Sequence, residues 1–502
     1  MKGPASVVFA PGALDQNSPA PLHRQLYEWY REAILSRQLR PGMRLPSTRS
    51  LAAELHISRI PILNAFEQLL AEGYVDSRVG AGTFVANAIP DELSRPRRLV
   101  AAASTSGRDT RRISRKMQAL LCCAPQPWAR IRGAFRASVP DLQQFPFEVW
   151  GRLVMRHARK PAAGLMDYSS PMGYLPFRKA IAEYLGTSRG VRCDPRQIMV
   201  VTGSQQGLQL SARVLLDTGS PVWIEEPGYR GAQQALNMAG ARLVPVPVDD
   251  EGLNVAAGIR CCRSPRAIYV TPSHQYPTGV TLSAARRLRL LDWAARSGAW
   301  ILEDDYDSEF RFSSRPIAAL QGMDTGQRVI YIGTFSKVLF PALRLGYIVI
   351  PKDLVGAFVA AREAIDIFTS TLYQSVLADF ISEGHFARHI RKMRMLYVER
   401  RNLLVEALRA ELGDVLEILK PEAGMHLVAM LPPGLEDTAV AEAAAQENLS
   451  VMPLSFCYLR RAPRPGLILG YGIATPAQIQ EGARRLAQVF RAMPERSGQK
   501  RR

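Results

Sequence analysis

The first patterned stretch of the chain predicts a compact helical module that ends in a hairpin. Apolar residues at helical spacing mark an amphipathic helix, namely Leu22, Leu26, Trp29, Tyr30, Ala33 and Ile34. Ser47 is placed to cap a short helix that runs to Leu55, and Ser58 to cap a third helix that runs to Glu72. Short alternating stretches at 74–77 and 83–85 flank Gly80-Ala81-Gly82 and predict two strands of a β-hairpin.

A different pattern begins near residue 135, where short apolar runs alternate with helical segments. The predicted strands are 198–201, 222–225, 243–246, 267–270, 300–303, 329–332 and 347–350, and one of the helices between them spans 283–296. Such alternation predicts an α/β domain with a mainly parallel sheet covered by helices. A single long helix is predicted over 372–411, followed by a smaller C-terminal α/β region.

These patterns divide the 502 residues into three parts. We predict one domain over 20–86, a linker over 87–134 and a second domain over 135–490. The linker is rich in Pro, Ser, Gly and Arg and has no sustained periodicity, apart from a segment of helical character at 113–121.

Positive charge is concentrated in the front of the chain. The net charge is +19, and residues 1–134 hold 19 Lys and Arg against 10 Asp and Glu. Within that part, residues 87–134 hold 10 basic and 3 acidic residues. This density favours a polyanion partner, nucleic acid first, although a solvated basic linker has the same composition.

Other classes of protein receive no support from the sequence. No apolar run approaches the 18 or so residues of a membrane-spanning helix, so we expect no membrane partner. The six cysteines show neither zinc spacing nor a disulfide framework. We therefore expect reduced thiols in a cytoplasmic protein, with no metal site.

The predicted N-terminal elements, three helices and a two-stranded wing, have the outline of a winged helix-turn-helix. Its third helix, which begins at Ser58, would enter the major groove of double-stranded DNA, where Arg59 reaches a base edge or a phosphate. The preceding loop and helix start would hold phosphates through Arg44, Ser47 and Arg49. Gly80 would let the backbone of the wing approach the DNA closely.

Several sequence motifs of this segment resemble those of a known family. Residues 21–26, 39–52, 58–59 and 72–74 resemble the GntR-type winged-helix domain in sequence order. The resemblance implies that Arg49 and Arg59 are the principal arginines that contact an operator. Pro61 and Leu63 depart from the family pattern, so the operator sequence does not follow from it.

The second domain offers the groups that pyridoxal 5'-phosphate requires. Lys337 supplies an amine for an aldimine with its aldehyde, and Asp304 a carboxylate for its pyridine nitrogen. Tyr306 is a donor for its phenolic oxygen, and Tyr229 is placed to stack on its ring. A strand-to-helix turn with Ser204 and Gln205, together with Ser336 and Arg344, predicts a phosphate cradle.

Three phrases, 271–279, 303–310 and 333–337, resemble the fold-type I aminotransferase domain over residues 135–490. Together with the front segment they resemble the MocR/GabR-type transcriptional regulators. The resemblance implies that Tyr168 reaches the cofactor phosphate of a partner subunit, and therefore a homodimer.

Two positions depart from the aminotransferase pattern. Tyr276 stands where an Asn usually bonds the phenolic oxygen of the cofactor. Ile468 stands where many members place the Arg that clamps the substrate carboxylate. Arg230 is a candidate substitute for that Arg, and an exposed arginine without such a role is the alternative.

Two hypotheses follow. The first is a transcriptional regulator whose aminotransferase-like domain senses pyridoxal phosphate, or an amine or amino-acid effector, through Lys337. The alternative is a catalytically active aminotransferase with an accessory DNA-binding domain. The missing clamp at Ile468 favours the first.

Overall fold

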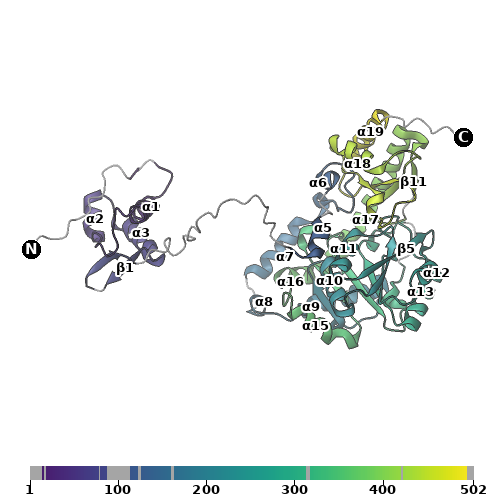
Figure 1. The fold of residues 1–502 in the computed structure, drawn as a ribbon, viewed down its shortest axis with the longest axis horizontal. Coiled ribbons are helices and arrows are strands. Elements are labelled where there is room, and N and C mark those ends of the chain that lie inside the picture. The colour runs from purple at the N-terminus through teal and green to yellow at the C-terminus, as the bar shows by residue number, and fades with distance from the viewer. Residues whose placement is uncertain are drawn as a thin grey trace, which may run out of the picture. The chain divides into compact units, whose positions relative to one another are not determined.

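The structure is a computed structural model, and it describes residues 14–15, 18–78, 80–87, 113–121, 126–159, 163–312, 317–419 and 422–493. The chain divides into two compact units, residues 1–112 and 113–502 (Figure 1). Most of the predicted linker, 88–112 and 122–125, lies outside the described residues.

The first unit has the predicted three helices and hairpin. They are α1 (Leu22–Leu35), α2 (Thr48–Leu55), α3 (Arg59–Ala71), β1 (Val75–Arg78) and β2 (Gly82–Val85), with the two strands antiparallel. Ser47 caps α2 as predicted, because its side chain accepts a hydrogen bond from the backbone N–H of Ser50. Ser58 occupies the N-cap position of α3, but its side chain makes no capping bond, so that part of the prediction is wrong. Leu26, Leu51 and Phe66 are among the residues that form the core between the helices.

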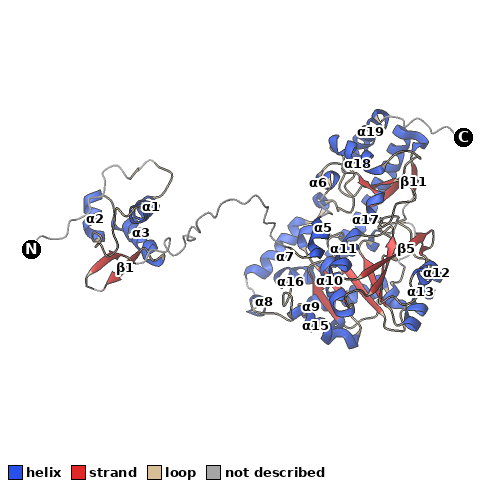
Figure 2. Cartoon of the chain, in the orientation of Figure 1, coloured by secondary structure: helices blue, strands red, loops and turns tan. Residues whose placement is uncertain are grey.

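The second unit is built on a sheet of eight strands in the order β3-β10-β9-β8-β7-β4-β5-β6. Figure 2 shows red strands of this unit with blue helices around them. The strands are β3 (Ile198–Val201), β4 (Pro221–Glu226), β5 (Arg242–Asp249), β6 (Gly252–Leu253), β7 (Ala267–Val270), β8 (Trp300–Asp305), β9 (Val329–Thr334) and β10 (Gly346–Val349). β4, β5, β7, β8 and β9 run parallel, whereas β10 is antiparallel to both of its neighbours and β6 is antiparallel to β5. The mainly parallel sheet of the prediction is confirmed.

Helices cover both faces of this sheet because its strands are apolar on both sides. In β4, Val222 and Ile224 pack in one core cluster while Trp223 packs in another on the opposite face. The first cluster includes side chains of α10 (Ser204–Leu215), α11 (Arg230–Met238) and α15 (Val355–Glu363). The second includes side chains of α12 (Val255–Cys261), α13 (Ala284–Ser297) and α14 (Leu320–Met323).

The remaining helices surround the sheet or belong to a smaller C-terminal subdomain. They are α5 (Arg115–Leu121), α6 (Pro127–Arg130), α7 (Phe147–Arg159), α8 (Ala163–Met166), α9 (Leu175–Arg189), α16 (Leu372–Ser382), α17 (His385–Leu412), α18 (Asp437–Gln446) and α19 (Pro476–Ala492). The subdomain has a four-stranded antiparallel sheet, ordered β11-β12-β14-β13, of β11 (Glu417–Leu419), β12 (His426–Met430), β13 (Met452–Pro453) and β14 (Gly466–Gly470).

One predicted element is wrong in extent. The single helix expected over 372–411 is two helices, α16 and α17, which meet at Gly384. Gly384 has φ +75°, a left-handed conformation that glycine adopts without the steric penalty of a Cβ atom. The apolar and charged periodicity continues across this glycine, which is why the pattern alone predicts one helix.

Candidate cofactor site and DNA-contacting surface

Eight of the nine predicted cofactor-binding residues line one cavity of about 370 Å³ in the second unit. They are Ser204, Gln205, Tyr229, Asp304, Tyr306, Ser336, Lys337 and Arg344. They come from the last residues of β8 and from the segments that follow β3, β4, β8, β9 and η4 (Pro341–Leu343), which lie far apart in sequence. The ends of parallel strands are where ligands bind in sheets of this kind.

Lys337 lies three residues after the end of β9, with its amine buried in the cavity. Its Nζ donates a hydrogen bond to the carbonyl of Ser138 at 2.9 Å. Burial lowers the pKa of Lys337, and the nearby carboxylates Asp307 and Asp304 oppose that change. A lowered pKa increases the fraction of unprotonated amine, the form that attacks an aldehyde.

Asp304 presents one unpartnered carboxylate oxygen to the same cavity. Its Oδ2 accepts a hydrogen bond from the hydroxyl of Tyr269 at 2.8 Å, whereas its buried Oδ1 has no partner among the described residues. Burial raises the pKa of Asp304 to about 7. A protonated pyridine nitrogen would supply both the missing donor and the opposite charge, so this carboxylate fits pyridoxal phosphate.

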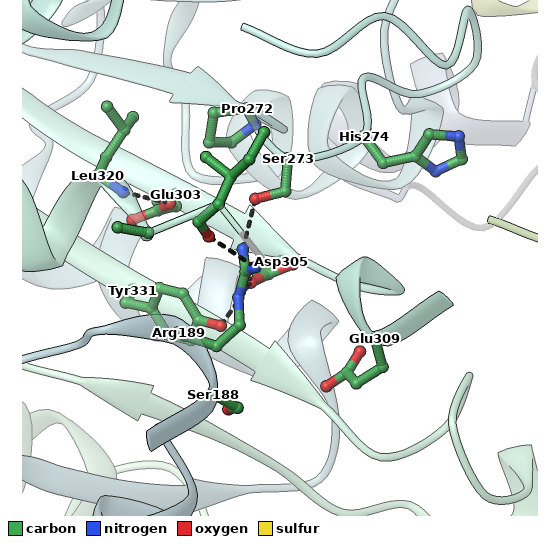
Figure 3. A network of polar contacts seen from close by, with 12 residues as sticks. Ser188, Arg189, Pro272, Ser273, His274, Glu303, Asp305, Glu309, Leu320 and Tyr331 are labelled. Atoms are coloured by element: carbon green, nitrogen blue, oxygen red, sulfur yellow. Dashed lines mark hydrogen bonds and ion pairs between the residues drawn. The ribbon is translucent and has the colours of Figure 1, made fainter. Parts of the chain in front are cut away.

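Polar contacts hold Glu303 and Asp305, the two neighbours of Asp304 in β8 (Figure 3). Glu303 accepts hydrogen bonds from the backbone N–H groups of Leu320 and Gln321, at 2.8 and 2.9 Å. Asp305 accepts one from Arg189 at 2.8 Å and one from the hydroxyl of Tyr331 at 2.6 Å. Because successive strand residues point to opposite faces, these contacts direct Asp304 into the cavity.

The phosphate end of the cavity is formed by the start of α10. Gly203, with φ +111°, precedes this helix, and a Cβ atom there would lie 3.4 Å from Nη1 of Arg344. The guanidinium of Arg344 therefore lies against the helix N-terminus, where backbone N–H groups favour an anion. The buried hydroxyl of Ser336 has no hydrogen-bond partner among the described residues. This donor set fits a phosphate.

Aromatic side chains form the walls of the cavity. The rings of Tyr229 and Tyr276 meet edge to face with centroids 5.6 Å apart, and those of Tyr276 and Tyr306 with centroids 6.0 Å apart. Burial raises the pKa of Tyr229 to about 12, so this phenol stays neutral at ordinary pH. Tyr276 thus contributes an aromatic wall at the position where the family pattern has an amide.

Three other residues named from the sequence lie elsewhere. Tyr168 is 80% exposed, packs against Phe368 and does not line the cavity within this chain. Arg230 stacks on the ring of Phe456 at 3.9 Å and donates to its carbonyl, so its guanidinium is held away from the cavity lining. Ile468 is fully buried in β14.

Ile468 belongs to an apolar cluster that adjoins the cavity. Val428, Leu454 and Cys457 are buried with it, and the partly buried Ala137, Tyr276 and Met452 pack against them. Ala137, Tyr276 and Met452 also line the cavity. The position that the family pattern gives to an arginine therefore supports an apolar wall.

Several site residues were missed by the sequence prediction. Tyr269 bonds Asp304, Ser138 bonds Lys337, and His274 bonds both Tyr306 and Asp307. Tyr269 could have been predicted, because β7 and β8 are parallel neighbours and side chains near the ends of such strands lie close together. Ser138 precedes the sheet in sequence, and nothing in its own neighbourhood indicates the contact.

The first unit exposes the residues predicted to contact DNA. Arg44, Ser47, Arg49, Ser58 and Arg59 are exposed, and so is Gly80, which has φ +77° in the turn of the wing. Nε of Arg59 donates to the hydroxyl of Thr48 at 2.8 Å, which ties the start of α3 to the start of α2. The Arg44 side chain lies against Gly82 of the wing, where a Cβ atom would be 3.0 Å from Nε. Basic groups thus lie at the α2 and α3 starts and beside the wing.

Each of the two units matches a known protein family. Residues 22–85 match the model of the gntR family of bacterial regulatory proteins, and residues 139–486 match that of aminotransferase class I and II. The fold and cavity of the second unit are those of a pyridoxal-phosphate-binding aminotransferase domain. α-Aminoadipate aminotransferase LysN from Thermus thermophilus, solved with N-(5'-phosphopyridoxyl)-L-leucine, is 31% identical, with a TM-score of 0.67 over 75% of this chain and 95% of that one.

Full-length relatives combine the same two units. The chain is 44% identical to the probable rhizopine catabolism regulatory protein MocR of Rhizobium meliloti over 97% of each protein. It is 30% identical to the pyridoxine biosynthesis transcriptional regulator PdxR of Corynebacterium glutamicum, over 92% of this chain and 94% of that protein. The chain belongs to the MocR-type transcriptional regulators, which join a gntR-family DNA-binding domain to an aminotransferase-like domain.

The described residues of the chain show neither a membrane-spanning helix nor a metal site. None of their helices is long and apolar enough to cross a membrane. Within the same residues, no group of His, Cys, Asp and Glu side chains is arranged to hold a metal ion.

The first prediction concerns the ion pair between Arg189 and Asp305, the residue that follows Asp304 in β8. Arg189→Met leaves the Asp305 carboxylate buried beside Tyr331 without its cation, so we expect a loss of about 3–5 kcal/mol in the free energy of unfolding of the second unit. Urea titration measures it. Adding Asp305→Asn removes the uncompensated charge and should restore part of the loss. Equal stability of Arg189→Met and the native protein would show that this pair does not hold the end of β8.

Proposed function

We propose that the chain is a transcriptional regulator in which the state of the cofactor bound at Lys337 controls DNA binding by the first unit. The observation that carries this proposal is the pair of polar groups that the cavity brings together, the unpartnered Oδ1 of Asp304 and the amine of Lys337, which donates to the carbonyl of Ser138. Pyridoxal phosphate would engage both at once. Lys337 bonds the aldehyde, Asp304 the pyridine nitrogen, and Tyr306 the phenolic oxygen.

The other site residues complete the proposed binding mode. Tyr229 stacks on the ring, and the phosphate is held by Ser204, Gln205, Ser336 and Arg344. Operator DNA contacts Arg44, Ser47, Arg49, Ser58, Arg59 and Gly80. We infer that the two domains span 20–86 and 135–490 and that the basic linker 87–134 joins them. We also infer that the protein is cytoplasmic and binds its operator in the cytoplasm.

The effector is proposed to be an amine or amino acid, or pyridoxal phosphate itself. An amine displaces Lys337 from the cofactor aldehyde, whereas changes in pyridoxal phosphate supply alter the occupancy of the cavity. The apolar cluster around Ile468 lacks the guanidinium that would clamp a carboxylate, and Arg230 is held by Phe456. These contacts favour the supply of pyridoxal phosphate as the sensed variable.

Aminotransferase activity is the second candidate, and the likeness to the Thermus enzyme supports it. It requires turnover of an amino acid with a 2-oxo acid that depends on Lys337. The absence of turnover in protein that carries the bound cofactor would exclude it.

A homodimer is proposed from the exposed apolar side chains near Tyr168. Met166, Tyr168, Ile365, Ile367 and Tyr373 are between 43% and 80% exposed. They lie close together, because the hydroxyl of Thr371 donates to the carbonyl of Leu165, and Tyr168 packs against Phe368. Large contiguous apolar patches mark interfaces. A second copy would cover this patch and bring Tyr168 to the partner's phosphate.

Charge introduced into that patch tests the dimer. We expect Met166→Asp with Ile365→Asp to sediment as a monomer, because each carboxylate would have to be buried without a partner. Leu288→Asp on α13 is the matched control, since Leu288 is 58% exposed and lies outside the patch. A doubly substituted protein that still sediments as a dimer would argue against this surface.

Removal of the amine tests the regulatory proposal. With an operator recovered by sequencing the DNA bound in vivo, we expect Lys337→Ala to lose the change in DNA affinity that pyridoxal phosphate causes in the native protein. Coupling of this kind is typically about 1–3 kcal/mol, or roughly 5- to 150-fold in affinity. Fluorescence anisotropy of labelled operator measures it.

Two variants separate the possible causes of a null result. Lys352→Ala, an exposed lysine outside the cavity, should respond to pyridoxal phosphate like the native protein. Arg59→Ala should bind operator more weakly with or without the cofactor, since Arg59 lies at the exposed start of α3. Unchanged affinity and an unchanged response in Lys337→Ala would overturn the proposal.

A further inference from the structure

A buried histidine lies directly behind Tyr306. Nδ1 of His274 is 2.9 Å from Oδ1 of Asp307 and 3.0 Å from the hydroxyl oxygen of Tyr306. His274 and Asp307 are 2% and 1% exposed, and neither lines the cavity, whereas Tyr306 does. His274 therefore contacts the cavity lining through Tyr306, whereas the charge of Asp307 also acts on Lys337.

The hydrogen-bonding capacity of these groups fixes the direction of the Tyr306 hydroxyl. An ionised carboxylate only accepts hydrogen bonds, so the contact with Asp307 places a hydrogen on Nδ1 of His274. A protonated Nδ1 cannot accept a hydrogen bond, so its single hydrogen, directed at Asp307, is shared with the oxygen of Tyr306 as a second acceptor. The hydroxyl hydrogen of Tyr306 is left to point into the cavity.

The surrounding backbone is shaped to admit this histidine. Gly424 has φ +88°, and a Cβ atom there would lie 2.1 Å from Cε1 of His274 and 2.9 Å from Oδ2 of Asp307. A residue with a side chain at 424 would therefore displace both groups. Nε2 of His274 is buried and has no partner among the described residues, so the ring is held through Nδ1.

We propose that His274, oriented by Asp307, is a positioning residue that makes Tyr306 a hydrogen-bond donor toward the phenolic oxygen of the cofactor. The proposal rests on the proposed role of Tyr306 in the cofactor site. In this chain Tyr276 stands at the position of the usual amide donor, and its hydroxyl contacts Sδ of Met452. The orientation of the Tyr306 hydroxyl therefore decides whether Tyr306 bonds the phenolic oxygen.

Other titratable groups near His274 do not replace it. The His426 ring lies 5.3 Å away, and burial, followed by the charge of His274, lowers its pKa to about 3, so it stays neutral. Burial and the charge of Asp307 raise the pKa of Tyr471 well above its usual value. Lys337 and Asp304 lie on the cavity side, and their contacts are with Ser138 and Tyr269.

The test is a pH titration of the visible absorbance of the full-length protein loaded with pyridoxal phosphate. This absorbance follows the proton on the nitrogen that joins Lys337 to the cofactor, a proton shared with the phenolic oxygen. A hydroxyl that donates to this oxygen stabilises it after the proton leaves and so lowers the midpoint pH. A hydrogen bond to a charged group is strong enough to shift a pKa by about one to two units.

We expect Tyr306→Phe and His274→Leu each to raise the midpoint by about one to two pH units. The midpoint of the double variant should be no higher than that of Tyr306→Phe alone, because His274 acts through Tyr306. His274→Asn keeps an N–H group at the place of Nδ1 and should restore a midpoint near that of the native protein. If His274→Leu does not fold, His274→Phe replaces it, since it keeps an aromatic ring in the same space and removes both ring nitrogens without changing the charge of Asp307.

The outcomes separate this proposal from the one on which it rests. A native midpoint in His274→Leu, or additive shifts in the double variant, would overturn the positioning role. An unchanged midpoint in Tyr306→Phe that still shows the visible band would instead overturn the proposed role of Tyr306. No visible band in the native protein loaded with pyridoxal phosphate would overturn the proposed cofactor site itself.

Discussion

Three consecutive buried carboxylates at the end of β8 are the constraint around which the cofactor site is built. Burial raises the pKa of both Glu303 and Asp304 to about 7. On one face Arg189 pairs with Asp305 and two backbone N–H groups bond Glu303, and on the other face the hydroxyl of Tyr269 bonds one oxygen of Asp304. Asp304 is left on the other face with a bare oxygen, which makes the cavity selective for a ligand that brings its own positive charge.

Other buried polar groups of the site also have incomplete hydrogen bonding. The Lys337 amine and the Ser336 hydroxyl are buried among groups that do not fully satisfy them. Unsatisfied buried groups cost stability, so a site of this kind is most stable when occupied. Ligand occupancy and the stability of the second unit are therefore linked. The basic segment 87–134, which lies mostly outside the described residues, connects that unit in sequence to the DNA-binding unit.

Much of the fold and site could be predicted from the sequence because the signals are local. The motifs that contain Lys337, Asp304 and Ser204 lie at or just after strand ends, and a parallel sheet brings such ends together. The break at Gly384 was missed because periodicity continues across it. Ser138 and His274 were missed as site residues because their roles depend on contacts with residues distant in sequence, Lys337 and Asp307. The predicted capping bond of Ser58 was wrong, since the residue occupies the position without making the bond.

Linkage between the two sites gives the most direct measurement. If cofactor occupancy controls DNA binding, operator DNA must change the affinity for pyridoxal phosphate by the same factor by which pyridoxal phosphate changes the affinity for operator. Titration of the cofactor-free native protein with pyridoxal phosphate, with and without saturating operator, measures one factor, and anisotropy measures the other. We expect two equal factors that differ from one. An affinity for pyridoxal phosphate that operator DNA leaves unchanged would contradict a regulatory role for the bond at Lys337.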